Sequence, residues 1–197
     1  MQIEKINNGI EKIEKVTFRL CDKLIDKADK YYISFRILNR CGFFVQSVNS
    51  LVFSFETFFK LLYLLDKEEY TINELKKLSH YNKKIAKKIR LDKEKFKCTW
   101  HIINKYDLEG IRYNDSHVTN VLNHLKINGK PFLETINLEI LELHRIITEK
   151  IREKFKHPNY DAYSLYNNWK FSEKKEIKEI IEECLSKGNE KLDSSDT

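Results

Sequence analysis

Two stretches of the sequence place an arginine five residues before a histidine. They are Arg112 with His117 and Arg152 with His157. A histidine can accept the proton of a ribose 2′-hydroxyl, so that the oxygen attacks the neighbouring phosphorus. An arginine can bind the phosphate oxygens and stabilise the charge that develops in the transition state. Residues of these two types have the chemistry to cleave RNA without a metal ion, provided that their side chains meet at one phosphate.

The predicted element around each pair decides whether its two side chains can meet. On a regular helix, five positions turn the chain by about 140°, so the arginine and the histidine would not share a face. They would have to converge at a helix end or across a dimer interface. Arg112 falls in a loop before a predicted helix N-terminus, where backbone amides also favour a phosphate. We therefore take Arg112 and His117 as the first candidate pair, and Arg152 and His157 as the second.

The residues that could bind metals show no spacing typical of a metal site. The four cysteines, Cys21, Cys41, Cys98 and Cys184, are widely separated. None belongs to a C-x-x-C pair or lies at a zinc-site spacing from a histidine. This pattern is typical of reduced thiols in a cytoplasmic protein. The sequence also contains no Gly-rich phosphate loop, so it predicts neither a metal nor a cofactor.

The segment 76–97 is strongly basic, with ten Lys or Arg among its 22 residues. The candidate nucleic-acid-binding side chains are Lys76, Lys77, Lys83, Lys84, Lys87, Lys88 and Arg90. Such a segment could follow a nucleic-acid backbone by charge, while Tyr81, Phe96 or Trp100 stacks on a base. The alternative is a solvated helix face, with Phe96 and Trp100 returning to the core.

The elements that would carry these residues are helices. Only five Gly and two Pro interrupt the 197 residues, whereas all-β folds need many turn residues. Residues 3–24 place Ile, Leu and one Thr alternately three and four apart, which predicts a long N-terminal helix. This heptad stripe packs either within its own domain or against a second chain. The formal net charge of +6 indicates only a weak preference for anionic partners.

Residues 43–65 carry a broad apolar stripe, which predicts a helix at the centre of a bundle. Glu56 and Lys60 lie one turn apart in it, in the favourable order for an ion pair. A lipid-facing span would rarely tolerate such residues, so we expect a core helix and no membrane span. The N-terminus is charged and has no apolar stretch typical of a signal peptide.

The rest of the chain predicts more helices. One begins at a cap on Thr71 or Asn73 and continues to Ile89. Gly110 and the residues after it suggest a loop. The helices predicted beyond it are a short one through 126, a long one over 132–156 and a last one over 172–187, before a flexible polar tail at 188–197.

Three short segments carry a family resemblance through their order and spacing. They read Ser-Phe-Glu56-Thr-Phe-Phe-Lys60, Leu-Lys-Lys-Leu-Ser-His80-Tyr and Ile111-Arg112-Tyr113, the last followed by a loop and a long helix. Together they resemble the HEPN superfamily over roughly residues 40–157. The resemblance implies an up-and-down helical bundle, here with a long N-terminal helix and an extra C-terminal helix, in a single domain over 1–187.

The same resemblance implies what such a domain could do. Many HEPN proteins pair as dimers and act as metal-independent RNA endonucleases in toxin–antitoxin and other prokaryotic defence systems, recognised by an Arg-x4–6-His motif. Others bind nucleotides or serve as adaptors. Active members usually have a polar residue after the arginine, where this chain has Tyr113, and Ser79-His80-Tyr81 departs from the common Gly-His-Asp.

We therefore expect a cytoplasmic homodimer that binds RNA or a nucleotide, or acts as an adaptor for a cognate antitoxin or defence partner. The first alternative is a metal-independent endoribonuclease that uses Arg112 and His117. The second alternative is a structural dimerisation module built on the N-terminal heptads.

Overall fold

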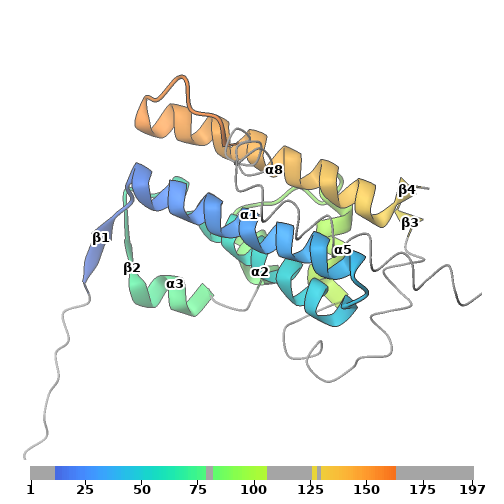
Figure 1. The fold of residues 1–197 in the computed structure, drawn as a ribbon. Coiled ribbons are helices and arrows are strands. Elements are labelled where there is room, and N and C mark those ends of the chain that lie inside the picture. The colour runs from blue at the N-terminus through green and yellow to red at the C-terminus, as the bar shows by residue number, and fades with distance from the viewer. Residues whose placement is uncertain (1–11, 79–81, 106–125, 128–129, 163–197) are drawn as a thin grey trace, which may run out of the picture.

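The computed structural model describes residues 12–78, 82–105, 126–127 and 130–162, and most of these residues are helical. Three long helices run alongside one another (Figure 1): α1 (Phe18–Arg40), α2 (Phe44–Leu65) and α8 (Phe132–Phe155). The all-α class that the composition predicted is confirmed, with two small two-stranded sheets added to it.

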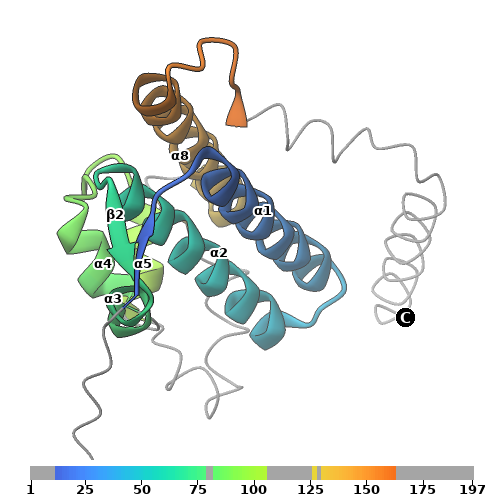
Figure 2. The same ribbon diagram turned by 90° about the vertical axis from the view of Figure 1, so that its left-hand side faces the viewer.

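Helix α2 is the centre of the described fold. It packs against α1 and α8 and, on another side, against α4 (Asn82–Lys88) and α5 (Lys97–Lys105) (Figure 2). Its phenylalanines at 55, 58 and 59 are fully buried. Among the described helices it alone is long and apolar enough to cross a membrane, and 72% of its most apolar window is buried inside the fold. The prediction of a buried core helix is confirmed.

The ion pair predicted inside α2 is also present. The Lys60 ammonium lies 2.5 Å from a carboxylate oxygen of Glu56, and both side chains are largely buried. The partners are one helical turn apart, so each is held by the same rigid element.

The prediction of one helix over 3–24 is wrong where the structure describes it. Residues Ile13–Lys15 form strand β1, which pairs antiparallel with β2 (Glu69–Thr71). Helix α1 begins only at Phe18, because the Thr17 side chain accepts the backbone N–H of Leu20 as an N-cap. The polar exception in the heptad stripe is therefore a helix start, and Ile13 and Leu20 do not lie on one continuous helix.

The single helix predicted from residue 71 to 89 is divided in two. Helix α3 (Ile72–Leu78) is capped by Thr71, one of the two predicted caps, whose hydroxyl accepts the Glu74 backbone N–H. Helix α4 begins at the buried Asn82, whose amide donates to the main-chain oxygen of Val52 in α2. That tertiary bond fixes the start of a second helix, a signal that periodicity alone does not carry.

The remaining described elements lie beside α8. Strands β3 (Lys126–Ile127) and β4 (Lys130–Pro131) form a small hairpin immediately before it. The long helix predicted over 132–156 is confirmed as α8 and stops before His157-Pro158. The helix predicted over 172–187 and the tail at 188–197 lie outside the described residues.

Candidate nucleic-acid interface

The seven cations singled out in the sequence lie on α3, on α4 and just after α4, and all seven are exposed. We call them the basic surface: Lys76, Lys77, Lys83, Lys84, Lys87, Lys88 and Arg90. The packing of α4 explains why its own four lysines face solvent. It buries Asn82, Ile85 and Ala86 toward α2, which leaves its four lysines on the outward side.

The charge of the whole chain is concentrated in this segment. Residues 72–90 contain seven Lys or Arg and one Asp or Glu, so they carry the same formal charge, +6, as the complete chain. The other residues therefore balance to zero. The modest overall charge conceals a strongly positive region on an otherwise neutral molecule.

Ion pairing separates the basic surface from three cations of α8. On α8, Arg145 bonds to both Glu142 and Glu149, Lys150 bonds to Asp66, and the Lys154 ammonium lies 2.9 Å from Glu68. Within the described residues, none of the seven cations of the basic surface forms such a pair. Their charge is available to an external anion.

The one carboxylate of this segment, Glu74, bonds to residues outside the segment. It accepts hydrogen bonds from the Tyr63 hydroxyl, in the last turn of α2, and from the Lys67 ammonium, just after that helix. These two bonds lower the pKa of the Glu74 carboxyl. Glu74 thus ties α3 to α2 and does not neutralise the basic surface. The sequence marked this residue as a single acid among seven cations, but it did not indicate its partners.

The aromatic residues that the structure describes near the basic stretch do not offer free rings. Phe96 is 1% exposed and Trp100 is 7% exposed, so the expectation that they stack on a base is wrong and the alternative, a return to the core, is confirmed. The half-buried Tyr63 ring has the ammonium groups of Lys67 and Lys88 at 4.7 and 5.0 Å from its centroid. Tyr81 lies outside the described residues.

Arg90 has an unusual backbone for its residue type. Its φ is 53°, in the left-handed region that favours glycine. The backbone N–H groups of Arg90 and Leu91 close onto the carbonyls of Lys87 and Ala86 at 3.2 and 2.9 Å. This is the Schellman arrangement that ends a helix. It projects an exposed guanidinium beyond the last lysine of α4.

The second candidate pair lies at the end of α8, where each side chain contacts a different neighbour. The Arg152 Nε donates to the main-chain oxygen of Tyr160 at 2.6 Å. The His157 ring stacks on Phe18, with centroids 5.2 Å apart and planes 5° apart. These contacts hold the segment after α8 against the start of α1. A joint role of Arg152 and His157 in catalysis stays a prediction. The first candidate pair, Arg112 and His117, lies outside the described residues.

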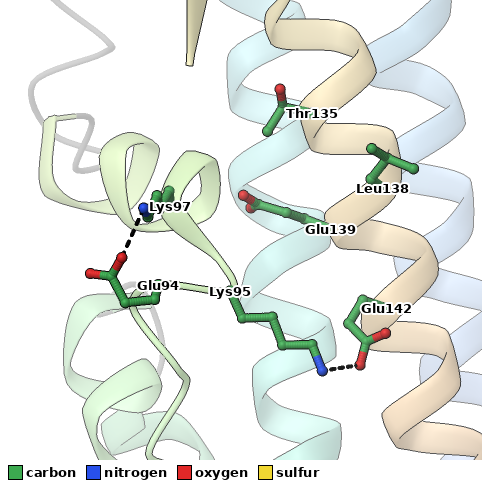
Figure 3. Close-up of a pocket in the computed structure, with 7 residues that line it drawn as sticks. All are labelled: Glu94, Lys95, Lys97, Thr135, Leu138, Glu139 and Glu142. Carbon is green, nitrogen blue, oxygen red and sulfur yellow. Dashed lines mark ion pairs between the residues drawn. The ribbon is translucent and has the colours of Figure 1, made fainter. Parts of the chain in front are cut away.

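A pocket of about 290 Å³ lies between the start of α5 and α8 (Figure 3). Its charged groups already have partners: Lys95 bonds to Glu142 and Lys97 to Glu94. The buried Glu139 accepts three hydrogen bonds of 2.6–2.8 Å from the backbone N–H groups of Cys98 and Thr99 and the Thr99 hydroxyl. These contacts make the site a joint between two helices.

A buried acid–histidine pair lies between α1 and α8. Asp29 Oδ1 and His144 Nε2 are 2.7 Å apart, and both side chains are almost fully buried. Nothing in the sequence indicated that Asp29 and His144 are partners. In the part of the chain that the structure describes, no three side chains of the metal-binding types gather.

Comparison with known proteins places the chain beside no relative. No family model, curated protein or solved structure matches it.

Proposed function

We propose that the protein binds RNA through the basic surface. The observation that carries this proposal is the concentration of the chain's whole net charge, +6, in residues 72–90, on side chains that are exposed and have no carboxylate partner among the described residues. An ordinary solvated helix face mixes both signs of charge, as α8 does.

The arrangement of the lysines on α4 suits a chain of phosphates. Lys83 with Lys87, and Lys84 with Lys88, form two pairs at a spacing of four residues. Four residues rise about 6 Å along a helix, which resembles the separation of successive phosphates along a nucleic-acid strand. Each phosphate that a lysine neutralises releases condensed counterions, and this release supplies most of the affinity of sequence-independent binding.

The wider setting is part of the same proposal. A HEPN-like bundle is supported by the Glu56–Lys60 pair inside the central helix and by a long helix, α8, after the loop region. On this view the chain acts in the cytoplasm as a homodimer, in a prokaryotic defence or toxin–antitoxin system. As an adaptor, it would bring bound RNA or a nucleotide to a cognate partner.

The experiment compares two charge-matched variants. One replaces Lys83, Lys84, Lys87 and Lys88 by Gln. The control replaces four other exposed cations, Lys15, Arg19, Lys23 and Lys27, by Gln. We expect the first variant to lose about tenfold or more in RNA affinity at moderate salt and to show a shallower salt dependence. The control variant should lose far less.

Equal losses in the two variants, or no RNA binding by the wild type, would contradict the proposal. Vesicles with anionic lipids test whether the lysines bind lipid headgroups instead of RNA. If vesicles bind through α4 and RNA does not, the basic surface is a membrane surface instead.

A further measurement incubates the same RNA with the protein in EDTA and examines whether the RNA is still intact. Recovery of intact RNA agrees with binding alone. Cleavage that His117→Ala abolishes would establish the endonuclease alternative and identify its general base.

A further inference from the structure

The rings described near the basic surface are unsuited to stacking on bases. Proteins that bind single strands usually combine a positive groove with aromatic side chains on which successive bases stack. Here Phe96 and Trp100 are in the core. The Tyr63 hydroxyl is bonded to Glu74, and ammonium groups from two lysines lie against its ring.

The cations are spread over a broad surface. The four lysines of α4 lie on the side opposite the residues that it buries, Ile85 and Ala86, and the charge continues onto Lys76 and Lys77 of α3. Helices α3 and α4 lie on the same side of α2, away from α1 (Figure 2). The pocket of Figure 3 lies elsewhere, between α5 and α8.

The residue types favour phosphates over bases. Six of the seven cations are lysines, whose ammonium groups act as point charges. Base reading in nucleic acids relies mainly on bidentate side chains such as arginine, asparagine and glutamine. Arg90 is the one guanidinium of the basic surface, and Asn82, the first residue of α4, is buried and bonded to α2.

Charge density then decides which nucleic acid such a surface prefers. Duplex DNA presents one negative charge for about every 1.7 Å of its axis, against about 3.4 Å for each strand. Duplex RNA likewise presents the phosphates of two strands. A broad surface of point charges therefore reaches more phosphates on a duplex than on one strand. A single strand gains no stacking on the described rings that would offset this difference.

We infer that the basic surface binds the phosphate backbone of double-stranded RNA in preference to single-stranded RNA, and without regard to base sequence. This inference rests on the proposed function, since it names the substrate class of the same surface.

The test measures binding of the wild-type chain to a short RNA duplex, to each of its strands and to duplexes of scrambled sequence, by fluorescence anisotropy over a salt series. We expect the duplex to bind several-fold more tightly than either strand, with a steeper salt dependence. Scrambled duplexes should bind within about twofold of one another. The variant with Lys83, Lys84, Lys87 and Lys88 replaced by Gln should lose affinity for every duplex alike.

A Tyr81→Leu variant tests stacking directly. We expect it to leave the ratio of duplex to single-strand affinity unchanged. A single strand that binds as tightly as the duplex, a marked sequence preference, or a selective loss of single-strand binding in Tyr81→Leu would each overturn the inference. All three outcomes include RNA binding, so the proposed function would survive them. Absence of binding to every RNA would instead contradict the proposed function.

Discussion

At the scale of single residues, Glu74 shows how one carboxylate can lie among seven cations without neutralising them. Its bonds to Lys67 and Tyr63 draw it toward α2. These bonds favour the ionised form, and so the pKa of the Glu74 carboxyl lies below its ordinary value. A lowered folded-state pKa stabilises the fold above the pKa of the unfolded chain, and this contribution is lost as the pH falls through the folded-state pKa.

We therefore expect Glu74→Gln to lower the free energy of unfolding at pH 7 by about 0.5–1 kcal/mol, a modest value because the cluster is partly exposed. The deficit should shrink as the pH falls below 4.5, since the wild-type carboxyl then becomes protonated too. Urea unfolding at several pH values measures both. Glu69→Gln, at an exposed acid of β2, is the control. A deficit that stays constant down to low pH would show that the ionised Glu74 is not the source. RNA affinity should not fall, since the change removes a negative charge.

At the scale of elements, three helices end in the same way. Gly42 after α1, Arg90 after α4 and Lys156 after α8 have φ values of 80°, 53° and 52°. In each case the next residue donates its N–H to a carbonyl five residues earlier, at 2.9, 2.9 and 3.3 Å. Glycine adopts this backbone without strain, whereas other residues lose roughly 1–2 kcal/mol. Two of the three ends therefore carry a cation where glycine would be more stable.

Arg90 and Lys156 share the same strained backbone, so a glycine substitution at one serves as the control for the other. A glycine at either position relieves backbone strain, but it also gives the unfolded chain more freedom, which costs about 0.4–1 kcal/mol. Because the relief of strain is larger, Arg90→Gly and Lys156→Gly should each raise the free energy of unfolding by about 0.5–1 kcal/mol. Both remove one positive charge. Only Arg90→Gly should weaken RNA binding, because Lys156 follows α8 and is not part of the basic surface. Denaturant unfolding and anisotropy measure the two effects. Equal weakening by both variants would show that net charge alone matters.

Periodicity predicted the long helices well, and it failed where a contact with a distant residue determines the secondary structure. The apolar stripes of α2 and α8 follow the helical repeat, so their bounds were nearly correct. Ile13 fits a three-and-four spacing equally well, but it lies in β1 because that segment pairs with residues 69–71. The start of α4 likewise depends on the bond from Asn82 to Val52. Neither partner can be read from local sequence.

At the scale of the whole molecule, the sequence identified the cations of the candidate site but could not show their availability. The sequence already contained their number and order. Their exposure depends on which side of α4 packs on α2, and their lack of partners depends on where acids such as Glu74 and Glu142 are drawn. Both are properties of the packed fold. Residues 106–125, with Arg112 and His117, lie outside the described part, so that pair stays a prediction.

The packing of α5 depends on one carboxylate from a distant part of the chain. Glu139 of α8 accepts the N–H groups of Cys98 and Thr99 and the Thr99 hydroxyl, and it is 5% exposed. It thereby satisfies the first turn of α5 with a side chain about 40 positions away along the sequence. Helices α5 and α8 both pack on α2, so this contact joins two helices that cover the central helix.

Breaking this joint should destabilise the whole fold. Glu139→Gln keeps the shape but turns an NH2 group toward N–H donors, so at least one buried donor loses its acceptor. We expect a loss of about 1–3 kcal/mol in the free energy of unfolding. Glu142→Gln is the matched control, because this neighbour lines the same pocket (Figure 3) and pairs with the partly exposed Lys95; its loss should stay below about 1 kcal/mol. Urea unfolding followed by tryptophan fluorescence reports the difference, since Trp100 lies on α5. Similar losses in the two variants would mean that α5 is held by apolar packing, with the carboxylate contributing little.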